Sequence, residues 1–103
     1  MVYRVEITTR AEGDLDTIYS TVTTETRQTG QRWFDSFETA ILSLSILPER
    51  CVSEPKLSSS HRVVRKLLFG KRRYVYRVYY AVLDDAVRIL PVRHAARKEP
   101  KRV

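Results

Sequence analysis

The residues best suited to chemistry lie in the C-terminal part of the sequence, where arginine, histidine and tyrosine alternate with small apolar side chains. Arg77 is flanked by tyrosines, and His94 belongs to the next apolar segment. A guanidinium among aromatic rings is a common arrangement for holding an anion. Histidine often accepts a proton near neutral pH. The two residues predict an anion-binding site with a histidine base, although Arg77 could be a solvated strand residue and His94 could hydrogen-bond the tail.

Charge is divided unevenly along the chain. Residues 1–60 carry six Lys or Arg and nine Asp or Glu, a net charge of −3, whereas residues 61–103 carry thirteen and three, a net charge of +10. A basic segment of this density predicts an acidic partner, which could be a nucleic acid, an acidic protein or a membrane surface. A basic surface that only confers solubility is the alternative.

Length and composition limit the class of protein. A chain of 103 residues, 43% of them hydrophobic, predicts one folded domain over residues 1–103, with a basic, loosely held tail at 95–103. Cys51 is the only cysteine, so neither an internal disulfide nor a metal site is expected, and no cofactor. The longest apolar stretch, 40–47, is too short to span a bilayer, and no secretory signal is expected at the N-terminus. These features favour a cytoplasmic protein.

Residue periodicity predicts the order strand, helix, helix and three strands. Residues 3–8 alternate as in a half-buried strand, and Thr9 with Glu12 fits a capping box at a helix start. A second helix is predicted over residues 31–47, ended by Pro48. Its expected inward residues are Trp33, Phe37, Ala40, Ile41, Leu44 and Leu47.

In the second half of the chain, apolar residues recur with a period of two. Residues 48–61 are predicted to be a loop, and residues 62–68, 73–83 and 86–93 to be strands, with a turn at residues 70–72. The expected fold class is α+β, with an antiparallel helix hairpin on one face of a mainly antiparallel three-stranded sheet.

Asp84 and Asp85 fit a two-residue hairpin loop, which fixes a register for the last two strands. Because successive side chains alternate, that register assigns each residue to a face. The face toward the helices would carry Tyr76, Val78, Tyr80, Val82, Val87, Ile89 and Pro91. The opposite face, expected to be open, would carry Val75, Arg77, Tyr79, Ala81, Arg88, Leu90, Val92 and His94. Tyr79 could stack on a base there, and Pro91, which has no N–H, should lie at an edge or bulge.

Three strings in the second half resemble the RelE/ParE superfamily of toxins from bacterial type II toxin–antitoxin modules, a group that includes plasmid stabilisation proteins. They are residues 64–73 (VRKLLFGKRR), 76–78 (YRV) and 89–97 (ILPVRHAAR). The first half is similar to the helix hairpin of that family. It carries the matching residues Ala11, Asp14, Leu15, Ile18, Trp33, Leu44, Leu47 and Pro48.

The resemblance implies a toxin that a cognate acidic antitoxin neutralises, with no membrane partner and no small-molecule substrate. RelE-like members cleave mRNA on the ribosome as metal-independent endoribonucleases, whereas ParE-like members inhibit DNA gyrase without catalysis of their own. Carried over by position, the candidate catalytic residues are Arg65, Arg77, His94 and Arg97. The candidate residues for contact with nucleic acid or a partner are Lys71, Arg72, Arg73, Tyr79 and Arg88.

Two departures from the family weaken the nuclease interpretation. No aromatic residue follows Tyr80, so the C-terminal tyrosine of some RelE-like nucleases has no counterpart. The acidic residue of some nuclease members is also missing from the face predicted to carry Arg77. Both targets, mRNA on the ribosome and DNA gyrase, stay open, as does a non-toxic basic module of the same fold that binds only an antitoxin or nucleic acid.

Overall fold

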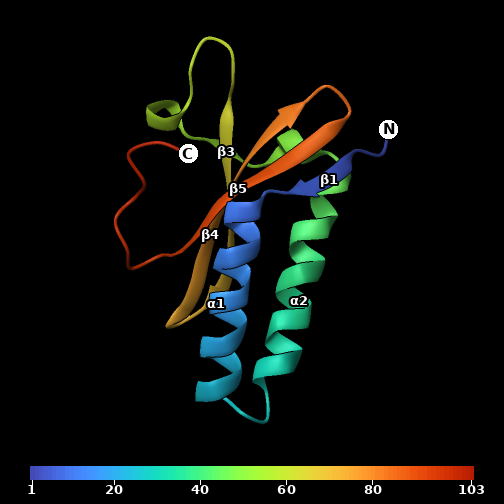
Figure 1. Cartoon of the computed structure of the whole chain (residues 1–103). Helices are drawn as coiled ribbons and strands as arrows, with labels where there is room; N and C mark the ends of the chain where they lie inside the picture. Colours follow the sequence, from blue (N-terminus) through green and yellow to red (C-terminus); the bar gives the residue numbers. More distant parts are fainter.

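The computed structural model describes residues 1–103 as a helix hairpin packed on one face of a single sheet (Figure 1). No helix is long and apolar enough to cross a membrane. The helices and strands are β1 (Arg4–Ile7), α1 (Thr9–Glu25), α2 (Gly30–Leu42), β2 (Val52–Ser53), β3 (Val64–Lys71), β4 (Tyr74–Leu83) and β5 (Ala86–His94). Short 3₁₀ turns occur at Ser43–Ser45, Pro48–Arg50 and Pro55–Leu57.

The sheet has five strands in the order β1-β5-β4-β3-β2. β1 runs parallel to β5, and all other neighbours are antiparallel. The predicted α+β class, helix hairpin and mainly antiparallel sheet are therefore confirmed. The sheet is wider than the three strands predicted, because the N-terminal strand joins it and residues 52–53, predicted as loop, form a short edge strand.

Thr8 is the N-cap of α1, one residue before the predicted cap at Thr9. Its backbone is extended, and its hydroxyl accepts a hydrogen bond from the Ala11 N–H at 3.3 Å. The same hydroxyl donates to the Ile89 carbonyl at 2.7 Å. Thr8 therefore both caps the helix and fastens its start to β5, which explains why it, rather than Thr9, takes the cap position.

The second helix ends earlier than predicted. α2 stops at Leu42 and tightens into a 3₁₀ turn, so the helical spacing no longer assigns the residues that follow to one face. Leu47, predicted to point inward, has a φ of 46° and is 72% exposed. Phe34 is buried, although it was not among the residues of this helix predicted to point inward.

An aromatic core joins the helices to the sheet. Phe37 stacks on Phe69 with ring centroids 5.3 Å apart, and Trp33 meets Tyr76 at 5.6 Å. Aromatic contacts of this geometry add to the free energy gained by burying apolar area. The predicted helix-facing set is confirmed in part, and its members found in this core are Tyr76, Val78, Tyr80, Val87 and Ile89.

Two tight turns set the ends of β4. The predicted loop at Asp84 and Asp85 is confirmed, since Leu83 lies opposite Ala86. The turn between β3 and β4 consists of Arg72 and Arg73, with Lys71 opposite Tyr74.

Candidate functional site

A bulge at Leu90 and Pro91 divides the pairing of β5 with β4 into two registers. Near the loop Tyr80 lies opposite Ile89, as predicted, but farther along Val78 lies opposite Val92. The missing N–H of Pro91 makes it suited to a bulge, where no ladder hydrogen bond is required of it. The predicted place of Pro91 is confirmed, and the uninterrupted register predicted for the hairpin is wrong beyond it.

The bulge moves His94 to the helix side of the sheet, so the prediction that it shares a face with Arg77 is wrong. His94 lies opposite Tyr76, with the ring centroids 5.1 Å apart. Its Nδ1 accepts a hydrogen bond from the Ala96 N–H at 3.0 Å, and its Nε2 donates to the Arg73 carbonyl. His94 therefore holds the β3–β4 turn and the start of the tail in place. This agrees with the alternative interpretation, in which His94 hydrogen-bonds the tail.

Arg77 is buried, with 7% of its surface exposed. Its Nη2 donates to the carbonyls of His94, at 3.3 Å, and Arg97, and its Nη1 lies 3.9 Å from Glu99 Oε1. The prediction of an open face is wrong because residues 95–103 fold back over it. We call this segment the C-terminal strap. The Arg77 guanidinium donates through Nη2 to the protein's own backbone and is not presented to solvent.

Acidic side chains do occur on the Arg77 face, contrary to prediction. Lys66 Nζ lies 2.7 Å from Glu54 Oε1 and 4.0 Å from Glu99 Oε1. Together with the Arg77–Glu99 contact, these distances define a row of alternating charges: Glu54, Lys66, Glu99 and Arg77. Glu54 reaches this row from the segment predicted as loop, and Glu99 reaches it from the strap, so neither could be assigned from strand alternation.

Tyr79 shares the Arg77 face, as predicted, but is fully buried and cannot stack on a base in this conformation. The Arg77 guanidinium lies 5.9 Å from its ring centre. Burial raises the pKa of the Tyr79 hydroxyl above its ordinary value, and the positive charge of Arg77 partly offsets that rise. The hydroxyl has no hydrogen-bond partner, nor does Arg77 Nε.

Arg65 lies opposite Tyr80, on the helix side of the sheet and away from the Arg77 face. Its Nη1 donates to the carbonyls of Cys51 at 2.8 Å and Glu49 at 3.2 Å. The Tyr80 hydroxyl donates a hydrogen bond to the Pro48 carbonyl. Burial is the main cause that raises the pKa of Tyr80 well above its ordinary value, and the neighbouring Cys51 raises it further. These contacts fasten the segment after α2 to the sheet.

Arg97 and His94 line a cleft of about 260 Å³ between α1 and the end of β5. Asp14 also lines it, but one of its carboxylate oxygens accepts the Val92 N–H at 2.9 Å. Of the four predicted catalytic residues, only Arg97 and His94 line this cleft, whereas Arg77 contacts the backbone carbonyls of both from the other side of the sheet. No group of three or more His, Cys, Asp or Glu side chains is placed to hold a metal ion.

Arg88 is exposed near the other end of β5. Its Nη2 lies 3.6 Å from Glu6 Oε1 on the neighbouring strand β1. An exposed ion pair of this kind contributes little to stability and leaves the guanidinium accessible to a partner.

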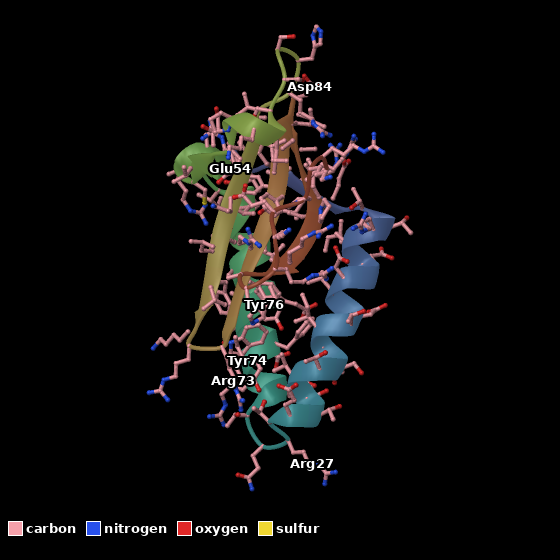
Figure 2. All side chains as sticks on the ribbon, turned by 90° about the vertical axis from the view of Figure 1, so that its left-hand side faces the viewer. Arg27, Glu54, Arg73, Tyr74, Tyr76 and Asp84 are labelled. Carbon is pink, nitrogen blue, oxygen red and sulfur yellow. The ribbon has the colours of Figure 1, made fainter.

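The basic turn formed by Lys71, Arg72 and Arg73 is exposed, and none of its three cations has a carboxylate partner. Figure 2 shows Arg73 and Tyr74 at one end of the sheet and Glu54 and Asp84 toward the other. The Arg73 guanidinium lies 5.5 Å from the Tyr74 ring centre.

Beside this turn, a cavity of about 450 Å³ opens between α2 and the β3–β4 hairpin. Its lining is Thr29, Arg32, Trp33, Ser36, Phe69, Gly70, Lys71 and Tyr74. The Tyr74 hydroxyl donates to Glu25 at 2.8 Å, and this hydrogen bond raises the Tyr74 pKa. Sequence reasoning missed this cavity because it assigned Trp33 wholly to the core, although Trp33 is only partly buried.

The architecture is that of solved toxins from bacterial toxin–antitoxin modules. The chain is similar to one in a structure of the chromosomal ParDE TA system from P. aeruginosa, with a TM-score of 0.71 and 16% identity over 90% of this chain and 96% of that chain. It is also similar to a double arginine-to-alanine mutant of E. coli toxin RelE in the free state, with a TM-score of 0.62 and 19% identity over 93% of this chain and 86% of that chain. At these identities the likeness shows a RelE/ParE-like fold.

The family follows from the sequence. The profile of the ParE toxin of the type II toxin–antitoxin system, parDE, matches residues 5–99. This chain therefore belongs to the ParE toxin family, which confirms the superfamily resemblance. No curated protein sequence matches it.

Proposed function

We propose that this protein is a toxin that inhibits DNA gyrase by binding, and that a cognate acidic antitoxin neutralises it. The observation that carries the proposal is the separation of the candidate catalytic residues. Arg65 and Arg77 lie on opposite faces of the sheet, and the Arg77 guanidinium is engaged by backbone carbonyls. Without a base beside Arg77, a binding mechanism fits the geometry better than hydrolysis or transfer at phosphorus.

The basic turn is the surface best suited to a target. Lys71, Arg72 and Arg73 are exposed, lack acidic partners and border the aromatic cavity at Trp33 and Tyr74. Unpaired cations steer an acidic partner, and adjacent aromatic surface supplies the apolar contact that interfaces need. Membership of the ParE family favours gyrase as that partner.

The test is a supercoiling assay with purified DNA gyrase and relaxed plasmid, together with primer extension on translated messages in cells that express the protein. We expect supercoiling to stop and messages to stay intact. Undisturbed supercoiling at saturating protein would overturn the proposal. Cleavage within translated messages would instead support an mRNA endonuclease, and harmless overexpression without an antitoxin would support a non-toxic binding module.

A matched pair of variants locates the surface. Arg72→Glu should weaken gyrase inhibition at least about tenfold, which corresponds to about 1.4 kcal/mol. Lys56→Glu is the control, because Lys56 is also exposed but belongs to the Pro55–Leu57 turn, beyond the opposite end of β3. Equal loss in both variants would show general charge attraction rather than a site at the turn.

A further inference from the structure

The aromatic cavity between α2 and the β3–β4 hairpin has the size and composition of a small-molecule site. Its volume is about 450 Å³, and sites for small ligands commonly have about 300–1,000 Å³. Its apolar wall consists of Trp33, Phe69 and Tyr74. By contrast, a depression of about 530 Å³ over residues 24–29 has no hydrophobic residue in its lining. The aromatic cavity is therefore the better place to bury the apolar part of a ligand.

Contacts within the protein hold the aromatic wall of this cavity in place. The ring centroid of Trp33 lies 5.1 Å from that of Phe37 and 5.5 Å from that of Phe69. The Tyr74 hydroxyl donates a hydrogen bond to the Glu25 carboxylate at 2.8 Å, which fixes the tyrosine ring 6.2 Å from Trp33. Because the wall is already formed, a ligand that enters has few side chains to order, and less free energy is lost on binding.

The charged groups of the cavity are both positive. Arg32 comes from α2 and Lys71 from the end of β3, and both side chains are exposed. Neither has a carboxylate partner in the protein. The lining also includes the hydroxyls of Thr29 and Ser36, but no acidic side chain. A ligand with an anionic group is therefore favoured here, and a ligand with an ammonium group is disfavoured.

The polar groups of the lining also indicate how polar the body of the ligand should be. The amino groups of a nucleobase need acceptors such as carboxylate or amide oxygens, and no side chain of the lining supplies either. The surface that remains for the body is the aromatic wall, which suits hydrocarbon. An aromatic hydrocarbon body with a single carboxylate therefore matches the cavity better than a nucleotide does.

We propose that the aromatic cavity is a binding site for a small, free amphipathic carboxylate with an aromatic body. The body packs against Trp33 and Tyr74, and the carboxylate is held by Arg32 and Lys71. Because Lys71 also belongs to the basic turn, a bound ligand would cover part of the surface assigned to the target. That consequence rests on the proposed function, whereas the binding site itself does not.

The experiment uses the fluorescence of Trp33, which is the only tryptophan of the chain and therefore reports on this cavity directly. Diphenylacetate is titrated into the full-length protein while the tryptophan emission is recorded. Diphenylmethanol and diphenylmethylamine are the matched controls, because they carry the same rings with a neutral or a positive group. Acetate tests the negative charge without the rings.

We expect diphenylacetate to change the Trp33 emission saturably with a Kd below about 1 mM, and to bind at least about tenfold more tightly than either control. Acetate should leave the emission unchanged. Equal affinity for diphenylmethanol would overturn the proposal, because the cavity would then be only an apolar contact surface. The absence of a saturable change up to about 10 mM diphenylacetate would overturn it as well.

A set of three variants tests the placement of the carboxylate. Arg32→Gln and Lys71→Gln should each weaken diphenylacetate binding at least about threefold. Lys56→Gln is the control, because it removes the same charge from an exposed residue of the Pro55–Leu57 turn, beyond the opposite end of β3. Circular dichroism checks that all three variants are folded. An equal loss in the three would overturn the proposal, because only net charge would then matter.

A second measurement needs no variant. Diphenylacetate is added to the unaltered, isotopically labelled protein, and its NMR signals are followed. The indole N–H signal of Trp33 and the amide signals of Phe69 and Tyr74 should shift together along one binding curve. Shifts confined to other parts of the protein would overturn the assignment of the site. None of these measurements contains gyrase or an antitoxin, so their failure is distinct from failure of the proposed function.

Discussion

The ring of His94 meets the ring of Tyr76 edge-on across β4 and β5, with centroids 5.1 Å apart and an interplanar angle of 83°. Both ring nitrogens of His94 are used, one by the Ala96 N–H and the other by the Arg73 carbonyl. One imidazole thus joins the β3–β4 turn, the last strand and the first residues of the strap. We therefore expect the loss of His94 to lower the stability of the protein.

Replacement of His94 by Phe should therefore destabilise the protein. The substitution keeps an aromatic edge beside Tyr76 but leaves the Ala96 N–H and the Arg73 carbonyl without their partner. We expect the free energy of unfolding to fall by about 1–2 kcal/mol. Urea denaturation followed by circular dichroism measures the change, and an unaltered midpoint would show that the two hydrogen bonds are not formed in solution.

Replacement of Arg77 by Ala should cost more, because Arg77 donates from a buried position to two backbone carbonyls, those of His94 at the end of β5 and Arg97 in the strap. Hydrogen bonds from charged groups contribute about 1.5–3 kcal/mol, so we expect a loss of about 2 kcal/mol. Lys71→Ala is the control, since Lys71 is exposed and unpaired, and should change stability by less than about 0.5 kcal/mol. Thermal unfolding of both variants checks the order, and the reverse order would contradict the burial of Arg77.

Replacement of Gly70 by Ala should disrupt the β3–β4 hairpin. Gly70 has a φ of 110°, and an added Cβ would lie 1.7 Å from the Tyr74 carbonyl oxygen. The backbone would have to move, at an expected cost of more than about 2 kcal/mol. Gly13→Ala serves as the control, because Gly13 lies in α1 with nothing within 4 Å and should gain about 0.5–1 kcal/mol. Comparable stability of the two variants in urea would contradict this account.

Replacement of Tyr79 by Phe should not destabilise the protein. The Tyr79 hydroxyl is buried without a partner, so its removal ends a desolvation cost rather than a hydrogen bond. We expect a change between zero and a gain of about 1 kcal/mol. A loss of more than about 1 kcal/mol in the midpoint-derived free energy would show that the hydroxyl has a partner.

Stability should fall at alkaline pH. Burial raises the pKa of Tyr76, Tyr79 and Tyr80 above the ordinary value of about 10 that tyrosine has in an unfolded chain. Above that pH the unfolded chain loses protons that the folded protein retains, so the folded state is disfavoured. The free energy of unfolding should be insensitive to these tyrosines below about pH 9 and decline above about pH 10.

Urea titrations across that range, with tyrosinate absorbance as a second signal, measure this dependence. Tyr79→Phe should make the decline shallower, since it removes one of the three buried hydroxyls. A decline of the same steepness in Tyr79→Phe would exclude Tyr79 as a contributor.

Local sequence determined the order of the two helices and the main strands, and one face of the sheet. Alternation defined β4 and the helix-facing residues Tyr76, Val78 and Tyr80, and the Asp84–Asp85 loop set the register next to it. These features depend only on residues close together along the chain and on a two-residue turn. The alternation of apolar and polar residues is therefore enough to predict them. The same local evidence placed Pro91 at a bulge or an edge.

The tertiary structure decided which residues share a site. The bulge turned His94 away from Arg77, and Asp14, distant in sequence, accepts the Val92 N–H just beyond it. The strap has no periodicity to predict its path, yet its Arg97 carbonyl and Glu99 carboxylate cover Arg77 and keep it from solvent. A one-residue shift reverses every side chain that follows it, and a returning tail buries what a strand would expose, so the site could not be read from alternation alone.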